Sequence, residues 1–95
     1  MIECKSIEEV RDCINRIDDQ IVRLIAERSQ YVSEAIKYKK LPQEVNVPRR
    51  NEEIIQRVRE LSNHYGLDPI IAEGVYRSMI HEFVQFQMKE LEKRI

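Results

Sequence analysis

Hydrophobic residues recur at alternating steps of three and four along the first part of the chain. They are Ile7, Val10, Ile14, Ile17, Ile21 and Leu24, and the rhythm continues through Arg28, Tyr31, Ala35 and Tyr38. This spacing places them on one face of an α-helix, as in packed helices. Ser6 and Glu9 have the capping-box spacing at its start, and neither proline nor glycine occurs before Pro42. The pattern predicts one helix of about 33 residues.

Two further helices follow a loop over residues 40–47. Pro48 is favoured in the first turn of a helix, and Gly66 after Tyr65 is typical of a helix end. Asp68 and Pro69 then begin a third helix that runs to near the C-terminus. Both predicted helices carry apolar residues at helical spacing. The second helix has Ile54, Ile55, Val58 and Leu61, and the third has Ile70, Ile71, Val75, Met79, Ile80, Phe83, Val84, Phe86 and Leu91. The sequence therefore predicts an all-α, three-helix chain with a long first helix.

The length of the first helix has a consequence for assembly. At 1.5 Å per residue it would be about 50 Å long, whereas a compact chain of this size has a radius of gyration of about 12 Å. Two further helices are too few to cover its whole apolar face, and a second copy of the chain is the simplest way to bury the remainder. We expect residues 1–95 to form a single helical domain in an intertwined homodimer.

Composition narrows the possible partners. The chain has 16 Lys plus Arg against 17 Asp plus Glu, with a formal net charge of −1, so it lacks the basic excess of a nucleic-acid-binding protein. No apolar run is long enough to span a membrane, and acidic residues occupy the start where a signal peptide needs an apolar stretch. We expect a cytoplasmic protein with no nucleic-acid or membrane partner.

The residues that commonly hold metals or cofactors do not form recognisable motifs. Cys4 and Cys13 are too far apart for a zinc-binding or redox pair, and His64 and His81 are distant from both. Glycine-rich phosphate-binding loops and the common hydrolase signatures are also missing from the sequence. We therefore expect no metal and no cofactor.

Several polar residues interrupt the apolar faces. Arg28 occupies a position that calls for an apolar side chain, and a desolvated arginine needs an anion. Lys39 would face nearly the same way on the same predicted helix, and Arg50 and Gln87 lie on the apolar faces of the other two helices. Arg11 would point about 100° away from Arg28 and lie about 25 Å from it along the helix. It could reach the pocket of a partner chain in an antiparallel dimer.

Each of these residues taken singly also has a structural explanation. Arg28 could set the register of the helix or extend to the surface, the other cationic residues could be solvated, and Gln87 could be a satisfied buried amide. Together they indicate an anion site, because arginine forks bind carboxylates bidentately. The sequence offers no activated nucleophile, so any chemistry at a small dicarboxylate would rely on positioning and electrostatic stabilisation.

The ordered set of motifs resembles the all-helical (type II) chorismate mutases. Residues 10–18 and 21–28 are similar to the first helix of that family, and Tyr38 with Lys39, Arg49 with Arg50, and residues 80–87 continue the similarity. Residues 66–68, 73–74 and 80–81 are similar to the related isochorismate pyruvate lyases. The resemblance implies a dimer whose long first helices are shared between two active sites, with no cofactor.

The resemblance also implies a role for each candidate residue. Arg11 from the partner subunit would bind one substrate carboxylate, and Arg28 would bind the other. Lys39 and Gln87 would donate hydrogen bonds to the ether oxygen of the substrate. Arg50 would help to close the pocket.

Two positions depart from the pattern of many mutases. Asn51 stands where those enzymes carry an acid, and Phe83 stands where they carry a serine. The loop also resembles that of the lyases in being one residue shorter. The expected function is chorismate mutase, which converts chorismate to prephenate. An isochorismate pyruvate lyase giving salicylate and pyruvate is the alternative, and a non-catalytic helical dimer or regulatory binding module is the second alternative.

Overall fold

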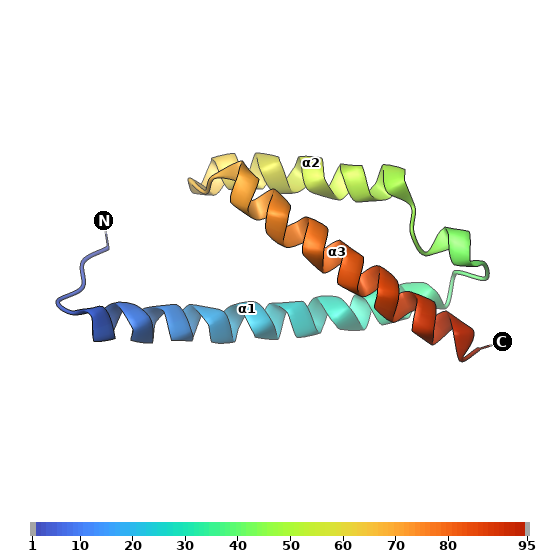
Figure 1. Ribbon diagram of the computed structural model, residues 1–95, viewed down its shortest axis with the longest axis horizontal. Coiled ribbons are helices and arrows are strands. Elements are labelled where there is room, and N and C mark those ends of the chain that lie inside the picture. The colour runs from blue at the N-terminus through green and yellow to red at the C-terminus, as the bar shows by residue number, and fades with distance from the viewer. Residues whose placement is uncertain (1, 95) are drawn as a thin grey trace. The chain divides into compact units, whose positions relative to one another are not determined.

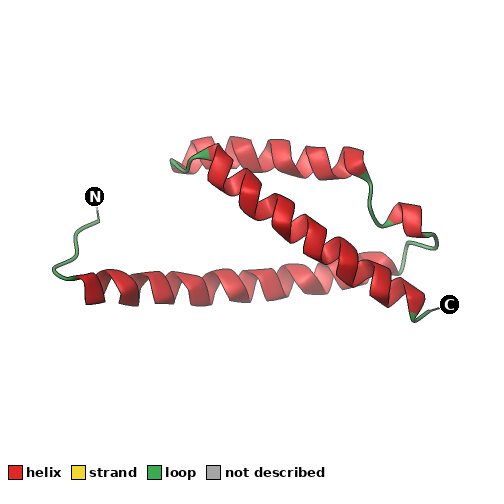
Figure 2. Ribbon diagram, in the orientation of Figure 1, coloured by secondary structure: helices red, strands yellow, loops and turns green. Residues whose placement is uncertain are grey.

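The computed structural model describes residues 2–94, and helices joined by loops and turns make up this part of the protein. Helix α1 spans Ile7–Ile36, a short 3-10 helix spans Pro42–Glu44, α2 spans Pro48–Tyr65 and α3 spans Pro69–Glu92 (Figures 1 and 2). None of the described residues lies in a strand. The predicted all-α class with three helices and a long first helix is confirmed. None of the helices in residues 2–94 is both long and apolar enough to cross a membrane.

Helix α1 starts as predicted but ends earlier. Ser6 Oγ accepts the backbone N–H of Glu9 at 3.1 Å, and the Glu9 carboxylate accepts the backbone N–H of Lys5. At the other end, the N–H of Lys39 donates to the carbonyl of Ile36, three residues back, at 3.0 Å. Such bonds tighten the last turn and end the α-helical geometry. Lys39 therefore follows α1 in a loop, and the prediction that it lies on the helix is wrong.

The chain divides into two compact units, one ending at Tyr31 and the other beginning at Val32. The first unit is most of α1, a single helix without another element of its own to cover its apolar face. At least two-fifths of the surface of each of the following residues is exposed: Ile7, Ile14, Ile17, Ile21 and Leu24. The apolar stripe predicted from the sequence is therefore present as a continuous exposed surface.

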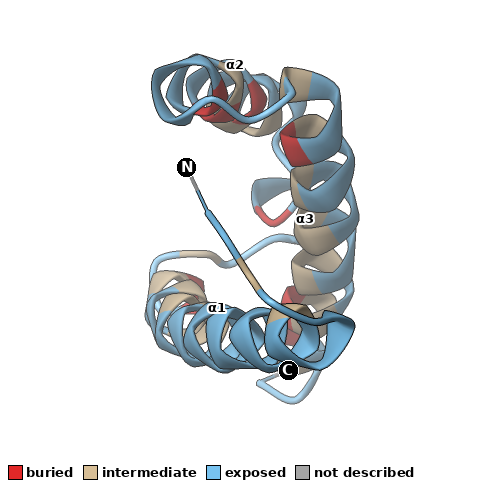
Figure 3. Ribbon diagram, turned by 90° about the vertical axis from the view of Figure 1, so that its left-hand side faces the viewer, coloured by how far each residue is buried: buried red, intermediate tan, exposed pale blue. Residues whose placement is uncertain are grey.

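The second unit is built on the packing of α2 against α3. Gly66 ends α2 in the left-handed conformation, with φ of 73°, and Asp68 caps α3 by accepting the backbone N–H of Ile70 at 3.0 Å. Both signals were predicted, and they produce a short connection between antiparallel helices. The buried apolar residues of this unit are Ile36, Val45, Ile55, Val58, Ala72 and Leu91. Figure 3 shows buried residues on both α2 and α3.

Replacing Ile55 by alanine tests this packing. Its side chain is 3% exposed, so Ile55→Ala should lower the free energy of unfolding by about 2–4 kcal/mol through lost burial and a residual cavity. Ile2→Ala removes the same atoms from a residue that is 91% exposed and serves as the control. Urea unfolding at one fixed protein concentration measures both, and equal effects of the two substitutions would contradict the assigned core.

Candidate functional site

Two of the candidate residues form a hydrogen bond. Lys39 Nζ donates to Gln87 Oε1 at 2.7 Å, although the residues are 48 positions apart in the sequence. Gln87 lies on α3 and is 8% exposed, and Lys39 is half-buried in the loop after α1. The bond uses one of the three ammonium donors and orients the amide so that its N–H groups point away from Lys39. This arrangement can present several donors to one acceptor atom.

The surroundings of Lys39 favour binding of an anion or an acceptor. Burial lowers the pKa of the Lys39 ammonium, and the nearby negative charge of Glu44 raises it by a smaller amount. A partly desolvated ammonium has lost water contacts that a ligand oxygen can replace. The polar atoms at this position therefore suit an oxygen acceptor that carries negative charge.

Glu44 fixes the loop that carries Lys39. Its carboxylate accepts the backbone N–H of Leu41 at 2.9 Å and also that of Lys40. These two backbone hydrogen bonds hold the pKa of the Glu44 carboxyl below its usual value. Sequence reasoning missed this residue. The available signal was a glutamate three residues after Leu41, with Pro42 between them, which is the spacing of a glutamate that caps a helical turn.

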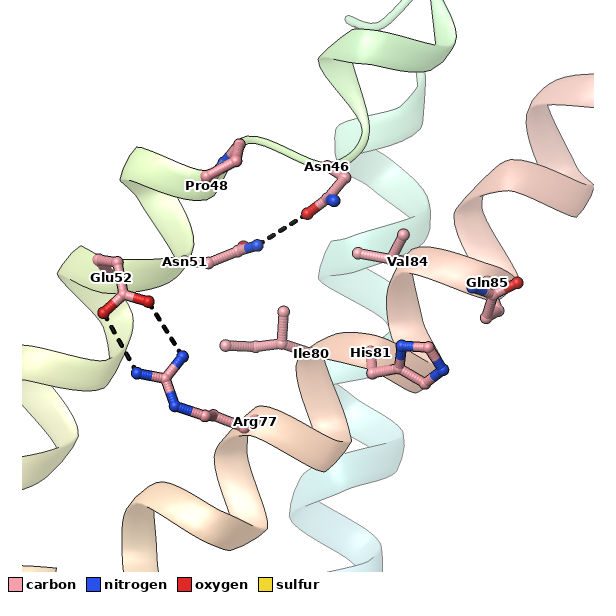
Figure 4. Close-up of a pocket in the computed structure, with 9 residues that line it drawn as sticks. All are labelled: Asn46, Pro48, Asn51, Glu52, Arg77, Ile80, His81, Val84 and Gln85. Atoms are coloured by element: carbon pink, nitrogen blue, oxygen red, sulfur yellow. Dashed lines mark hydrogen bonds and ion pairs between the residues drawn. The ribbon is translucent and has the colours of Figure 1, made fainter.

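A pocket of about 510 Å³ lies between the start of α2 and the middle of α3 (Figure 4). Its lining residues are Asn46, Pro48, Asn51, Glu52, Arg77, Ile80, His81, Val84 and Gln85. Asn51 Nδ2 donates to Asn46 Oδ1 at 2.8 Å, and Ile80 and Val84 provide an apolar wall. The volume suits a small organic ligand.

Helical spacing relates this pocket to the hydrogen bond between Lys39 and Gln87. Val84 lies three residues before Gln87 and Ile80 lies seven before it, so all of them share one face of α3. The pocket and the buried amide therefore belong to the same side of the helix. Lys39 and Gln87 are not among the lining residues, and Gln87 follows the lining residue Val84 by about one turn of α3.

The three arginines predicted for the site have different surroundings. Arg50 lies in the first turn of α2, where its Nη1 is 3.6 Å from Glu53 Oε2, and its neighbour Asn51 lines the pocket. Arg11 is exposed and Arg28 is half-buried, both on α1 in the first unit. The structure thus brings Lys39 and Gln87 together within the second unit, whereas Arg11 and Arg28 belong to the other unit.

The structure also shows the surroundings of Asn51 and Phe83, the two residues that differ from the pattern of many mutases. Asn51 faces the pocket as a neutral amide (Figure 4). Phe83 is half-buried and meets Phe86 edge to face, with ring centroids 6.4 Å apart. Asn51 is uncharged, so it places no negative charge at the pocket where the resemblance would suggest an acid.

Four charged residues that sequence reasoning missed connect α2 to α3. Arg77 Nη1 and Nη2 donate to the two carboxylate oxygens of Glu52 at 3.0 and 3.2 Å, and Arg77 Nε donates to Glu73 at 2.8 Å. Glu73 in turn accepts a hydrogen bond from Arg59 Nη1 at 2.6 Å. Hydrogen bonds from Arg77 lower the pKa of both carboxyls, Glu52 and Glu73.

Comparison with known proteins identifies the class to which this fold and these residues belong. Residues 10–88 match the chorismate mutase type II family, and the chain belongs to that family. It is 28% identical over 87 residues to an isochorismate pyruvate lyase of Pseudomonas aeruginosa, covering 92% of this chain and 86% of that protein. It is 31% identical over 94 residues to a chorismate mutase of Methanocaldococcus jannaschii, covering 98% of this chain and 93% of that protein.

The capping role of Glu44 predicts a pH-dependent contribution to stability. Its pKa is lower in the folded chain, so the ionised form stabilises the loop above the usual glutamate pKa of about 4.3. The contribution is lost as the pH falls through the lower folded-state value. Glu44→Gln should therefore lower the thermal unfolding midpoint at pH 7 and make little difference in strong acid.

Glu82→Gln is the matched control for this measurement, because Glu82 lies on the exposed surface of α3. Thermal unfolding of both variants and of the unaltered protein is followed by circular dichroism between pH 2 and pH 7. An equal effect of the two substitutions at pH 7 would contradict the capping role of Glu44.

Proposed function

We propose that the protein is a chorismate mutase that works as a homodimer. The observation that carries the proposal is the 2.7 Å hydrogen bond between Lys39 and Gln87, with a pocket of suitable size along the same face of α3. In this reaction one C–O bond breaks and one C–C bond forms within a single molecule, so no nucleophile is needed. Membership of the chorismate mutase type II family supports the assignment.

The donors act on the atom where charge develops. Negative charge grows on the ether oxygen as its bond to the ring breaks. Lys39 Nζ and Gln87 Nε2 donate hydrogen bonds to that oxygen in the proposed complex, and these bonds are stronger in the transition state than in the bound substrate. The orientation of Gln87 supports this role, because its Oε1 is already occupied by Lys39.

The arginines bind the two carboxylates of the substrate. Arg28 binds one, and Arg11 of the partner subunit binds the other, since guanidinium groups recognise carboxylates bidentately. Arg50, in the first turn of α2, closes the pocket over the bound molecule. These groups hold the substrate in a conformation in which the two carbon atoms that bond are close together.

The exposed apolar stripe of α1 supports the homodimer. Ile14 is 53% exposed and Leu24 is 57% exposed. An apolar stripe of this length is unfavourable in water when the chain is alone. A second copy packed along α1 would bury this stripe and bring Arg11 to the neighbouring site.

Isochorismate pyruvate lyase activity is the second candidate function. The amide of Asn51, hydrogen-bonded to Asn46 at the pocket wall, and the similarity to the lyase of P. aeruginosa favour it. In this reaction the ether C–O bond breaks while a hydrogen moves from the ring to the departing three-carbon group, which leaves salicylate and pyruvate. The same ether-oxygen donors would serve both reactions.

Product analysis separates these possibilities. The purified protein is incubated with chorismate and with isochorismate, and we expect prephenate from chorismate as the faster reaction. Lys39→Ala and Arg28→Ala should each lower turnover by about a hundredfold or more, because a preorganised charged donor is lost. Lys37→Ala, which removes an exposed lysine paired with Glu34, should leave turnover nearly unchanged.

Each alternative result has a definite meaning. Salicylate and pyruvate from isochorismate as the dominant products would assign the lyase function. A folded dimer without activity towards either substrate would leave a non-catalytic binding module. Full activity in Lys39→Ala would refute the proposed site.

Mixed dimers test whether a site is shared between subunits. Arg11→Ala and Lys39→Ala chains are each expected to be inactive when pure. After equal amounts are unfolded together and refolded, half of the dimers combine both chains, and each such dimer contains one intact site. Activity should then return to about a quarter of the unaltered level. No recovery would show that Arg11 and Lys39 serve the same chain's site.

A further inference from the structure

The four charged residues between α2 and α3 form a brace with two points of attachment on α2. Arg77 of α3 holds Glu52 near the start of α2 with a two-pronged hydrogen bond (Figure 4). Glu73 of α3 links the same Arg77 to Arg59, seven residues further along α2. The attachments on α2 are about 10 Å apart along the helix, so the brace opposes both sliding and separation of the two helices.

One attachment lies at the pocket. Glu52 and Arg77 both line it, Asn51 is the residue before Glu52, and Ile80 is one turn after Arg77. The helices diverge from their connection at Gly66, and the start of α2 is the end far from that connection (Figure 1). The contact of Arg77 with Glu52 therefore acts where the two walls of the pocket are least constrained by the connection.

The brace itself is poorly suited to binding a carboxylate of the substrate. Arg77 has five N–H donors, and three of them already donate to Glu52 and Glu73. The set contains two arginines and two glutamates, so it adds no net charge to the pocket wall. An anionic ligand would gain little from Arg77 unless Glu52 were displaced.

We propose that Arg77 is a positioning residue that, through Glu52, holds the start of α2 at the distance from α3 that the substrate requires. The inference rests on the proposed function, because it assigns the residues near Asn51 and Arg50 to substrate binding. It predicts that loss of the brace weakens substrate binding more than it slows the chemical step at Lys39 and Gln87.

The test compares a substitution of Arg77, which contacts Glu52, with a substitution of Arg59 at the other end of the brace. Arg77→Gln should raise KM by about fivefold to tenfold with kcat changed less than about threefold. Arg59→Gln breaks the bond to Glu73 but leaves the contact of Arg77 with Glu52, so it should change KM by less than about twofold. Urea unfolding of both variants checks that they are folded, and Arg77→Lys should restore KM only in part, because lysine lacks the planar fork.

A double-mutant cycle distinguishes positioning from direct binding. If Arg77 acts through Glu52, the combined variant Glu52→Gln with Arg77→Gln should have the same KM as either single variant. If the KM increases of the two single variants instead multiplied in the double variant, Arg77 would contact the substrate itself, and the proposal would be overturned. An unchanged KM in Arg77→Gln, or an equal rise in Arg59→Gln, would also overturn it.

Hydrogen exchange keeps this test separate from that of the proposed function. If the unaltered protein is inactive towards both substrates, the proposed function fails. The brace is then judged by exchange of the backbone amides of residues 49–53. Faster exchange in Arg77→Gln and Glu52→Gln than in Arg59→Gln would support the positioning role, and equal exchange in all of them would refute it.

Discussion

The packing of α2 against α3 determines where the polar groups of the second unit lie. Ile55 and Val58 of α2 and Ala72 of α3 are buried, and they fix the rotation of both helices about their axes. With α3 in this orientation, one face of it carries Arg77, Ile80, Val84 and Gln87 in successive turns. The apolar contact between α2 and α3 therefore determines the positions of the residues that line the pocket, form the brace and bond to Lys39.

Electrostatics differ between the two ends of this face. At Lys39 burial disfavours the charged ammonium and lowers its pKa, and the ammonium donates a hydrogen bond to the neutral amide of Gln87. At Arg77 the opposite holds, because two carboxylates stabilise the charged guanidinium and raise its pKa. A cation whose charge is not balanced by neighbouring carboxylates can stabilise negative charge that develops on a ligand. A cation whose charge is balanced in this way mainly holds other groups in position. This contrast underlies the different roles proposed for the two residues.

Local signals in the sequence predicted most helix boundaries, because Pro48, Gly66, Asp68 and the capping box act through neighbouring backbone groups. The end of α1 was predicted too late, since nothing in the apolar rhythm reveals that the last turn tightens after Ile36. The contacts of Lys39 with Gln87 and of Arg77 with Glu52 join residues 48 and 25 positions apart. Spacing on a single helix contains no information about such pairs. Polar residues on the apolar faces suggested that Lys39 and Gln87 belong to one anion site, and the resemblance to a family suggested that both donate to the same ligand atom.

The mutase and lyase reactions both break an ether C–O bond of the substrate, so the donors proposed at Lys39 and Gln87 would not distinguish between them. What differs is the position of the ring hydroxyl and the hydrogen that moves in the lyase reaction. On the proposed function, selectivity comes from the pocket at the start of α2, which is lined by the amides of Asn46 and Asn51 beside Ile80 and Val84. A neutral amide pair can both donate to and accept from a hydroxyl, whereas a carboxylate only accepts. On this proposal, the choice of substrate depends on how the start of α2 and the loop before it hold these amides, which connects specificity to the contact between the two helices.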